Sequence, residues 1–160
     1  MQTGADTHTV AFKAEPPALI GDPAWEPDGQ HLDAYVRTGN LGYLARYDAT
    51  SGSNNPTPRD QACSGFNPDN GMPDAIDVDG TGQLWIAVQT GSSMDVLRCT
   101  SGQPSKAFTI PGNDTPADID VTGDGSAILL TDVDGKVWRW DGGGAVQQLS
   151  TNAPLDHATW

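Results

Sequence analysis

The chain has 160 residues, and its 21 acidic side chains outnumber its 8 Lys and Arg side chains to give a formal net charge of −13. Such a charge excludes the basic face that nucleic-acid binding requires, and no apolar run approaches the roughly 18 residues of a membrane helix. The 19 glycines, 12 prolines and 5 tryptophans are typical of a turn-rich, all-β protein rather than a disordered chain.

The predicted strands follow one another in a definite order from the N-terminus. Residues 9–14 form the first strand, and a Pro-rich opening segment occupies 22–29. An apolar strand at 32–36 and an arginine-containing segment at 44–50 come next. Residues 51–70 are polar and rich in proline, which is typical of a loop insertion.

Two later parts of the chain repeat this order. Residues 73–82 align with residues 116–125, and Ile76 falls on Ile119, which lies 43 positions later. Each aligned segment is followed by a short apolar run of the length expected for a buried strand. An arginine followed by an apolar or aromatic residue recurs in all three parts, at Arg46, Arg98 and Arg139. The repeat therefore predicts one structural unit per part.

Each unit is predicted to contain four antiparallel strands. The Asp-Gly pair at 134–135 is a hairpin signal because both residues tolerate positive φ, and outer strands are expected at 106–110 and 146–150. The units span about 18–64, 72–111 and 115–151, with 9–14 as a strand of a preceding unit and 155–160 as a strand of a following unit. Four-stranded units of about 40–45 residues are typical of β-propeller blades, so residues 1–160 are predicted to be one all-β propeller region.

The number of predicted blades is low for a ring. A closed propeller needs about four to eight blades, and about three complete blades plus terminal strands leave faces uncovered. Three accounts remain open. The chain is part of a larger propeller, or a homo-oligomer completes the ring, or the terminal strands build a reduced fourth blade.

The repeated residues resemble known propeller families. The pattern Pro-x-x-Ile-Asp-Val-x-Gly-x-Gly, present at 73–82 and 116–125, resembles NHL-type and streptogramin-lyase-like blades. The segment Asp-Pro-Ala-Trp-Glu-Pro-Asp-Gly at 22–29 is similar to the opening of blades in Tol-type periplasmic propellers. The resemblance covers roughly residues 18–160 and implies a β-propeller, a fold shared by binding proteins, lyases, lactonases and peptidase-associated domains.

An acid stands at the entrance to each predicted innermost strand. These residues are Asp22, Asp74, Asp118 and Asp156. Innermost strands line the central channel of a propeller, so the carboxylates could converge and supply the oxygen ligands that Ca²⁺ requires. The alternative is that each Asp stabilises the turn before its strand. His157 also lies at a channel position and is the candidate general base of a lyase-type site, although no partner for it is visible.

Two further acids and the cysteines have two interpretations each. Asp77 and Asp120 lie inside opening strands, where they either form a polar row in the channel or accept hydrogen bonds from the next blade. Cys63 and Cys99 fall in sequence-adjacent blades, and a disulfide between them would fit an exported protein. Cys99 also aligns with aromatic residues, which fits a buried thiol instead.

The five tryptophans are expected to pack between blades, and a carbohydrate-binding platform is the functional alternative.

No Gly-x-Ser-x-Gly elbow, phosphate loop or dinucleotide fingerprint occurs. The sequence therefore favours a non-catalytic binding or scaffold module, exported from a bacterium, extracellular or periplasmic, that engages a protein or polymer through its loops or channel face and needs no cofactor. The alternative is a propeller lyase or lactonase that uses a divalent cation such as Ca²⁺ at the acids.

Overall fold

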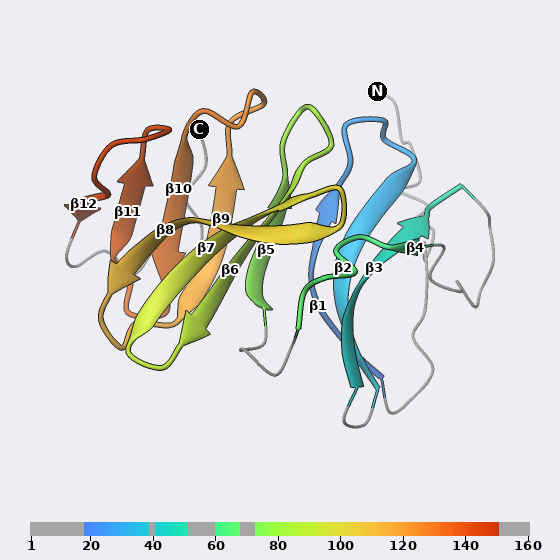
Figure 1. Cartoon of the computed structure of the whole chain (residues 1–160), viewed down its shortest axis with the longest axis horizontal. Coiled ribbons are helices and arrows are strands. Elements are labelled where there is room, and N and C mark those ends of the chain that lie inside the picture. The colour runs from blue at the N-terminus through green and yellow to red at the C-terminus, as the bar shows by residue number, and fades with distance from the viewer. Residues whose placement is uncertain (1–17, 39–40, 51–59, 68–72, 151–160) are drawn as a thin grey trace, which may run out of the picture.

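The computed structural model describes residues 18–38, 41–50, 60–67 and 73–150. All regular structure in these ranges is β-strand, arranged as three four-stranded sheets (Figure 1). No helix in the described part of the chain is long and apolar enough to cross a membrane. The predicted strands at 9–14 and 155–160 lie outside the described residues.

Each sheet is a simple meander in which chain neighbours pair antiparallel. The first sheet has the order β1 (Ala18–Trp25), β2 (His31–Thr38), β3 (Leu41–Asp48) and β4 (Asp60–Gln61). The second contains β5 (Pro73–Val78), β6 (Leu84–Thr90), β7 (Ser93–Thr100) and β8 (Gln103–Pro111). The third contains β9 (Pro116–Val121), β10 (Ile128–Asp132), β11 (Val137–Trp140) and β12 (Gln147–Ser150).

The sheets stand side by side in chain order, as the blades of a propeller do. The first strand of each sheet contacts the first strand of the next, β1 with β5 and β5 with β9. In Figure 1 the three sheets follow one another across the molecule and do not close a ring within the described residues. The predicted fold class, antiparallel four-stranded blades of a partial propeller, is therefore confirmed.

The continuous apolar run in β6 follows from its central position in the middle sheet. Successive side chains of a strand point to opposite faces. Leu84 and Ile86 face the first sheet, where they join a core with Tyr35. Trp85 and Ala87 face the third sheet and join the second core. Because both faces of the blade are covered, no position from Leu84 to Val88 remains exposed, and alternation between apolar and polar residues is lost.

The glycines of the repeat permit close contact between neighbouring blades. Gly80 and Gly123 occupy the same position in the turns that follow β5 and β9. A Cβ atom on Gly80 would lie 2.5 Å from the backbone oxygen of Gly123. Only a residue without a side chain fits at this distance, so the repeated glycine is required by blade packing.

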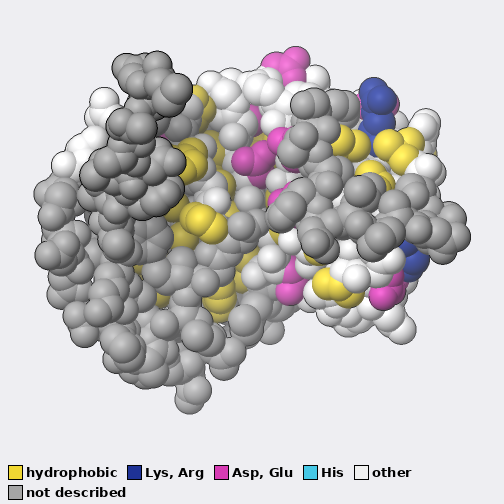
Figure 2. All heavy atoms as spheres, turned by 180° about the vertical axis from the view of Figure 1, so that it is seen from behind, with side chains coloured by type: hydrophobic (Ala, Val, Ile, Leu, Met, Phe, Trp, Pro, Cys, Tyr) yellow, Lys and Arg dark blue, Asp and Glu magenta, His cyan; other side chains and the backbone are white. Residues whose placement is uncertain are grey.

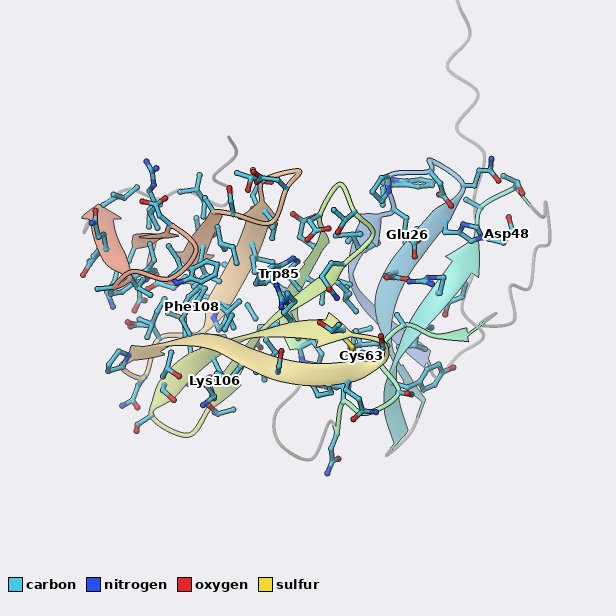
Figure 3. All side chains as sticks on the ribbon, turned by 45° about the horizontal axis from the view of Figure 1, so that its top comes forward. Glu26, Asp48, Cys63, Trp85, Lys106 and Phe108 are labelled. Atoms are coloured by element: carbon cyan, nitrogen blue, oxygen red, sulfur yellow. A yellow bond between two sulfur atoms is a disulfide. The ribbon has the colours of Figure 1, made fainter. Side chains whose placement is uncertain are left out.

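Aromatic side chains fill the interface between the second and third sheets (Figure 3). Trp140 stacks on Phe108 with ring centroids 5.1 Å apart and lies 6.1 Å from the ring of Trp85. Packing between blades is thus confirmed for Trp85 and Trp140, as it is for Trp138. Trp25 does not pack between described blades: it is 56% exposed, because it lies on the face of β1 opposite Ala24, and no described sheet covers that face. Trp160 lies outside the described residues.

Candidate functional site

Asp74 of the predicted acid ring holds the start of its own blade together. It is the second residue of β5, and its Oδ2 accepts a hydrogen bond from the backbone N–H of Gln89 at 2.9 Å. Burial raises the pKa of this carboxyl above its usual value, against the effect of that hydrogen bond. The Gln89 side chain in turn accepts a hydrogen bond from Thr115 at 2.9 Å, which links the second blade to the entrance of the third.

Asp118 lies in β9 opposite Thr131 of β10. Its charge and that of Asp120 both act on Asp77 of the preceding blade, so these three acids lie near one another. Figure 2, which views the molecule from behind, shows acidic side chains near the middle of that face. Asp22 lies in β1, but its side chain is outside the described part of the structure, and Asp156 and His157 lie outside the described residues.

Asp77 joins two innermost strands. Its Oδ2 accepts a hydrogen bond from the backbone N–H of Val121 in β9 at 2.7 Å, and its Oδ1 accepts one from Val78 N–H at 2.7 Å. Burial raises the pKa of Asp77 to about 6, and the neighbouring charges of Asp120 and Asp118 act in the same direction. The expectation that an acid at this position bonds to the next blade is confirmed for Asp77.

The raised pKa of Asp77 gives a test by pH. A carboxyl whose pKa is higher in the folded chain than in the unfolded chain adds stability below pH 4, and this contribution is lost as the pH rises through about 6. When the pH falls from 7 to 5, protonation of Asp77 should raise the unfolding free energy of the parent chain. Asp77→Asn cannot ionise, so we expect its rise over the same pH range to be smaller by about 1 kcal/mol, a value discounted for solvent screening. Urea unfolding at the two pH values measures this difference.

Asp124→Asn is the matched control for this measurement. Backbone and side-chain hydrogen bonds from Ser126 and Thr122 lower the pKa of Asp124 to about 2, so it does not titrate between pH 5 and pH 7. The control should therefore keep the pH dependence of the parent protein. If Asp77→Asn kept it as well, the assigned titration of Asp77 would be wrong.

A second buried acid, Asp33, is paired with the repeated arginine of the first blade. Asp33 has no exposed surface, and its Oδ1 lies 3.2 Å from Nε of Arg46 on the adjacent strand. Arg46 also forms an ion pair with Glu26. Burial nevertheless raises the pKa of Asp33 to about 6 against the effect of Arg46. The aligned arginines differ, since Arg98 lies over the ring of Trp85 and Arg139 pairs with Asp141.

Glu26, Asp28 and His31 form a cluster that the sequence analysis did not identify. One ligand atom from each residue lies within 4.8 Å of the others, at the turn between β1 and β2. Asp28 caps this turn, and hydrogen bonds from Gln30 N–H and from His31 lower its pKa to about 2. Since Arg46 already neutralises Glu26, the cluster contributes mainly to the turn.

Cys63 and Cys99 form a disulfide, so the disulfide is the correct one of their two interpretations. The bond connects Cys63, in the loop after β4, with Cys99 in β7, and the Cα–Cα distance is 5.9 Å. Both residues are buried in the core between the first and second sheets (Figure 3). The bridge thereby fixes the loop of the first blade against the second blade.

A cavity of about 410 Å³ opens where this loop meets the second sheet. The loop contributes residues 65–67, and strands β6 to β8 contribute Val88, Thr90, Asp95, Leu97 and Pro104. The walls are mainly apolar, and the Asp95 carboxylate supplies a charge. Sequence reasoning could not find this cavity, because its walls come from four segments that only the folded register brings together.

The structure is similar to solved propeller proteins. It superposes on TolB from Acinetobacter baumannii with a TM-score of 0.58 and 17% identity, covering 87% of this chain and 33% of that one. A putative TolB from Agrobacterium tumefaciens gives a TM-score of 0.59 and 16% identity, covering 86% of this chain and 50% of that one. At this level of identity the likeness concerns the fold, and this chain spans only a third to a half of those proteins. No described protein family and no curated protein matches the sequence.

Proposed function

We propose that this chain is a non-catalytic β-propeller binding module, exported from the cell, that engages a protein or polymer ligand. The cavity beside the disulfide carries this proposal. Ligand sites are typically preformed hollows with apolar walls and a few polar groups, set on a rigid scaffold. The disulfide supports export, because such bridges persist in oxidising compartments.

The contacts of the acids support a structural role for Asp74 of the predicted ring and for Asp77 inside β5. Asp74 and Asp77 each accept a hydrogen bond from a backbone N–H, which stabilises the inner strands. The alternative function, a lyase or lactonase with a divalent cation, would use Asp118 and Asp120, whose charges act on Asp77, although within the described residues these three acids do not bring their oxygens as close together as Glu26, Asp28 and His31 do. Asp118 and Asp120 lie two positions apart in β9 and so on the same face of the strand, where one oxygen from each would be the core of a cation site.

A selection from a phage-displayed peptide library against the purified chain tests the proposal. We expect enrichment of a consensus sequence whose synthetic peptide binds saturably and equally well in Ca²⁺ and in EDTA. The control is an unrelated protein of similar net charge. Failure to enrich any peptide beyond that control would contradict a protein-binding function.

Calorimetric titration with Ca²⁺ addresses the alternative. The binding-module proposal predicts no saturable heat at millimolar Ca²⁺ in either the parent chain or the Asp118→Ala variant. Saturable heat that disappears in Asp118→Ala would instead support a cation-dependent site at the inner strands.

A further inference from the structure

The carboxylate of Asp95, which lines the cavity, already holds an ammonium group. Its Oδ2 accepts hydrogen bonds from Nζ of Lys106 at 2.7 Å and from Oγ1 of Thr90 at 2.9 Å, and its Oδ1 accepts one from Oγ1 of Thr109 at 2.6 Å. A carboxylate has about four acceptor positions, so these three donors leave one unused. Asp95 itself is only 6% exposed and therefore has a fixed direction.

The ammonium that reaches Asp95 comes from the solvent side. The Lys106 side chain is 55% exposed, whereas the carboxylate that it meets is buried. Burial alone would raise the pKa of Asp95, but hydrogen bonds from Lys106, Thr109 and Thr90 outweigh it and lower the pKa. The carboxylate is thus charged at neutral pH. Its present partner is the flexible side chain of Lys106, which a competing cation can displace.

The surroundings of Asp95 suit a cation on an apolar stem. Phe66, Val88, Leu97 and Pro104 line the cavity beside the carboxylate. Lys and Arg side chains bury their methylene groups against apolar surface while their charged heads remain at a polar group. A free ammonium or a metal ion would leave those apolar walls without a partner.

We propose that this cavity binds a Lys or Arg side chain from a basic segment of a partner protein, with the charged head on Asp95 and the stem against Phe66 and Leu97. The inference rests on the proposed binding function and specifies the chemistry of the partner. The net charge of −13 supports it, because an acidic protein attracts a basic segment and speeds its association. Lys106 occupies the head-group position when the partner is absent.

The test uses a fluorescein-labelled peptide of sequence Gly-Leu-Lys-Leu-Gly and fluorescence anisotropy at low salt. A matched peptide replaces Lys with norleucine, which has nearly the same apolar stem and no charge. We expect the norleucine peptide to bind about tenfold more weakly, since a charged hydrogen bond at a buried carboxylate is lost. Equal affinities for the two peptides would overturn the proposal.

Variants of the protein separate this site from general charge attraction. Lys106→Ala removes the internal competitor and should raise the affinity for the Lys peptide about fivefold or more. Lys136→Ala makes the same change in net charge in the third blade, where Lys136 pairs with Asp114, and should leave the affinity within about twofold. Asp95→Asn should abolish the preference for Lys over norleucine.

The outcomes distinguish failure of the site from failure of the proposed function. If Lys106→Ala binds no more tightly than Lys136→Ala, the cavity is not the site, and the inference is overturned. A library-selected peptide that still binds the parent chain saturably would leave the proposed function standing in that case. If no library peptide binds either, the inference and the protein-binding form of the proposed function fail together.

Discussion

Loss of the Cys63–Cys99 disulfide is expected to lower the free energy of unfolding by about 3–4 kcal/mol. The two cysteines are 36 positions apart, and a cross-link of that span restricts the unfolded chain by about this amount in the loop-entropy description. Both sulfur atoms lie in the core between the first and second blades, so the folded state also loses a link between blades. Urea unfolding of the chain with and without reductant measures the effect.

The double variant Cys63→Ala, Cys99→Ala supplies the control. Alanine keeps these buried positions apolar, so the variant should resemble the reduced parent chain in stability, apart from the small cavities left by the sulfur atoms. Reductant should not change the variant further. A parent chain that unfolds at the same urea concentration with and without reductant would show that the disulfide does not link the blades.

Trp85→Ala is expected to destabilise the chain by about 3–5 kcal/mol, the range for removal of a buried aromatic side chain. Trp85 is 1% exposed and lies in the core between the second and third sheets, next to Trp140. Its Nε1–H also donates to Oδ2 of Asp79 at 3.0 Å, so the substitution leaves a buried carboxylate with one donor fewer. Chemical unfolding followed by circular dichroism gives the value.

Two matched substitutions identify the source of the loss. Trp85→Phe keeps an aromatic ring and removes the N–H donor, so its effect should be smaller, at about 1–2 kcal/mol. Trp25→Ala removes an equally large side chain that is 56% exposed and should change the stability by about 0.5 kcal/mol or less. Similar losses for Trp25→Ala and Trp85→Ala would contradict the assignment of Trp85 to the interface.

The propeller blades could be predicted because the same local sequence pattern occurs three times along the chain. Apolar strands, Asp-Gly turns and glycines recur in register, and the recurring Gly80 and Gly123 meet in the fold. The contact of Asp77 with the next blade was foreseeable for the same reason, since an acid inside an apolar strand needs a donor. These features depend on positions within one repeat or in adjacent repeats.

Features that depend on register or on distant segments were not predictable in this way. The ion pair between Asp33 and Arg46 requires the exact pairing of β2 with β3, although an acid within the apolar run 32–36 was a usable signal. The sequence could not decide between a disulfide and a buried thiol, because spacing alone does not establish that two cysteines are close. Trp25 aligns with Val78, which is buried against the first sheet, whereas no described sheet lies on the Trp25 face of β1.

The central claim is that an acid of the innermost strands joins one blade to the next. The backbone amide proton of Val121 reports on this contact directly, because it donates to Asp77, 44 positions earlier in the chain. Followed by NMR as a function of pH, its chemical shift is predicted to change with a midpoint of about 6, the pKa of Asp77, and to lose that titration in Asp77→Asn. A Val121 amide shift that is flat between pH 5 and pH 7, or that titrates unchanged in Asp77→Asn, would contradict the account.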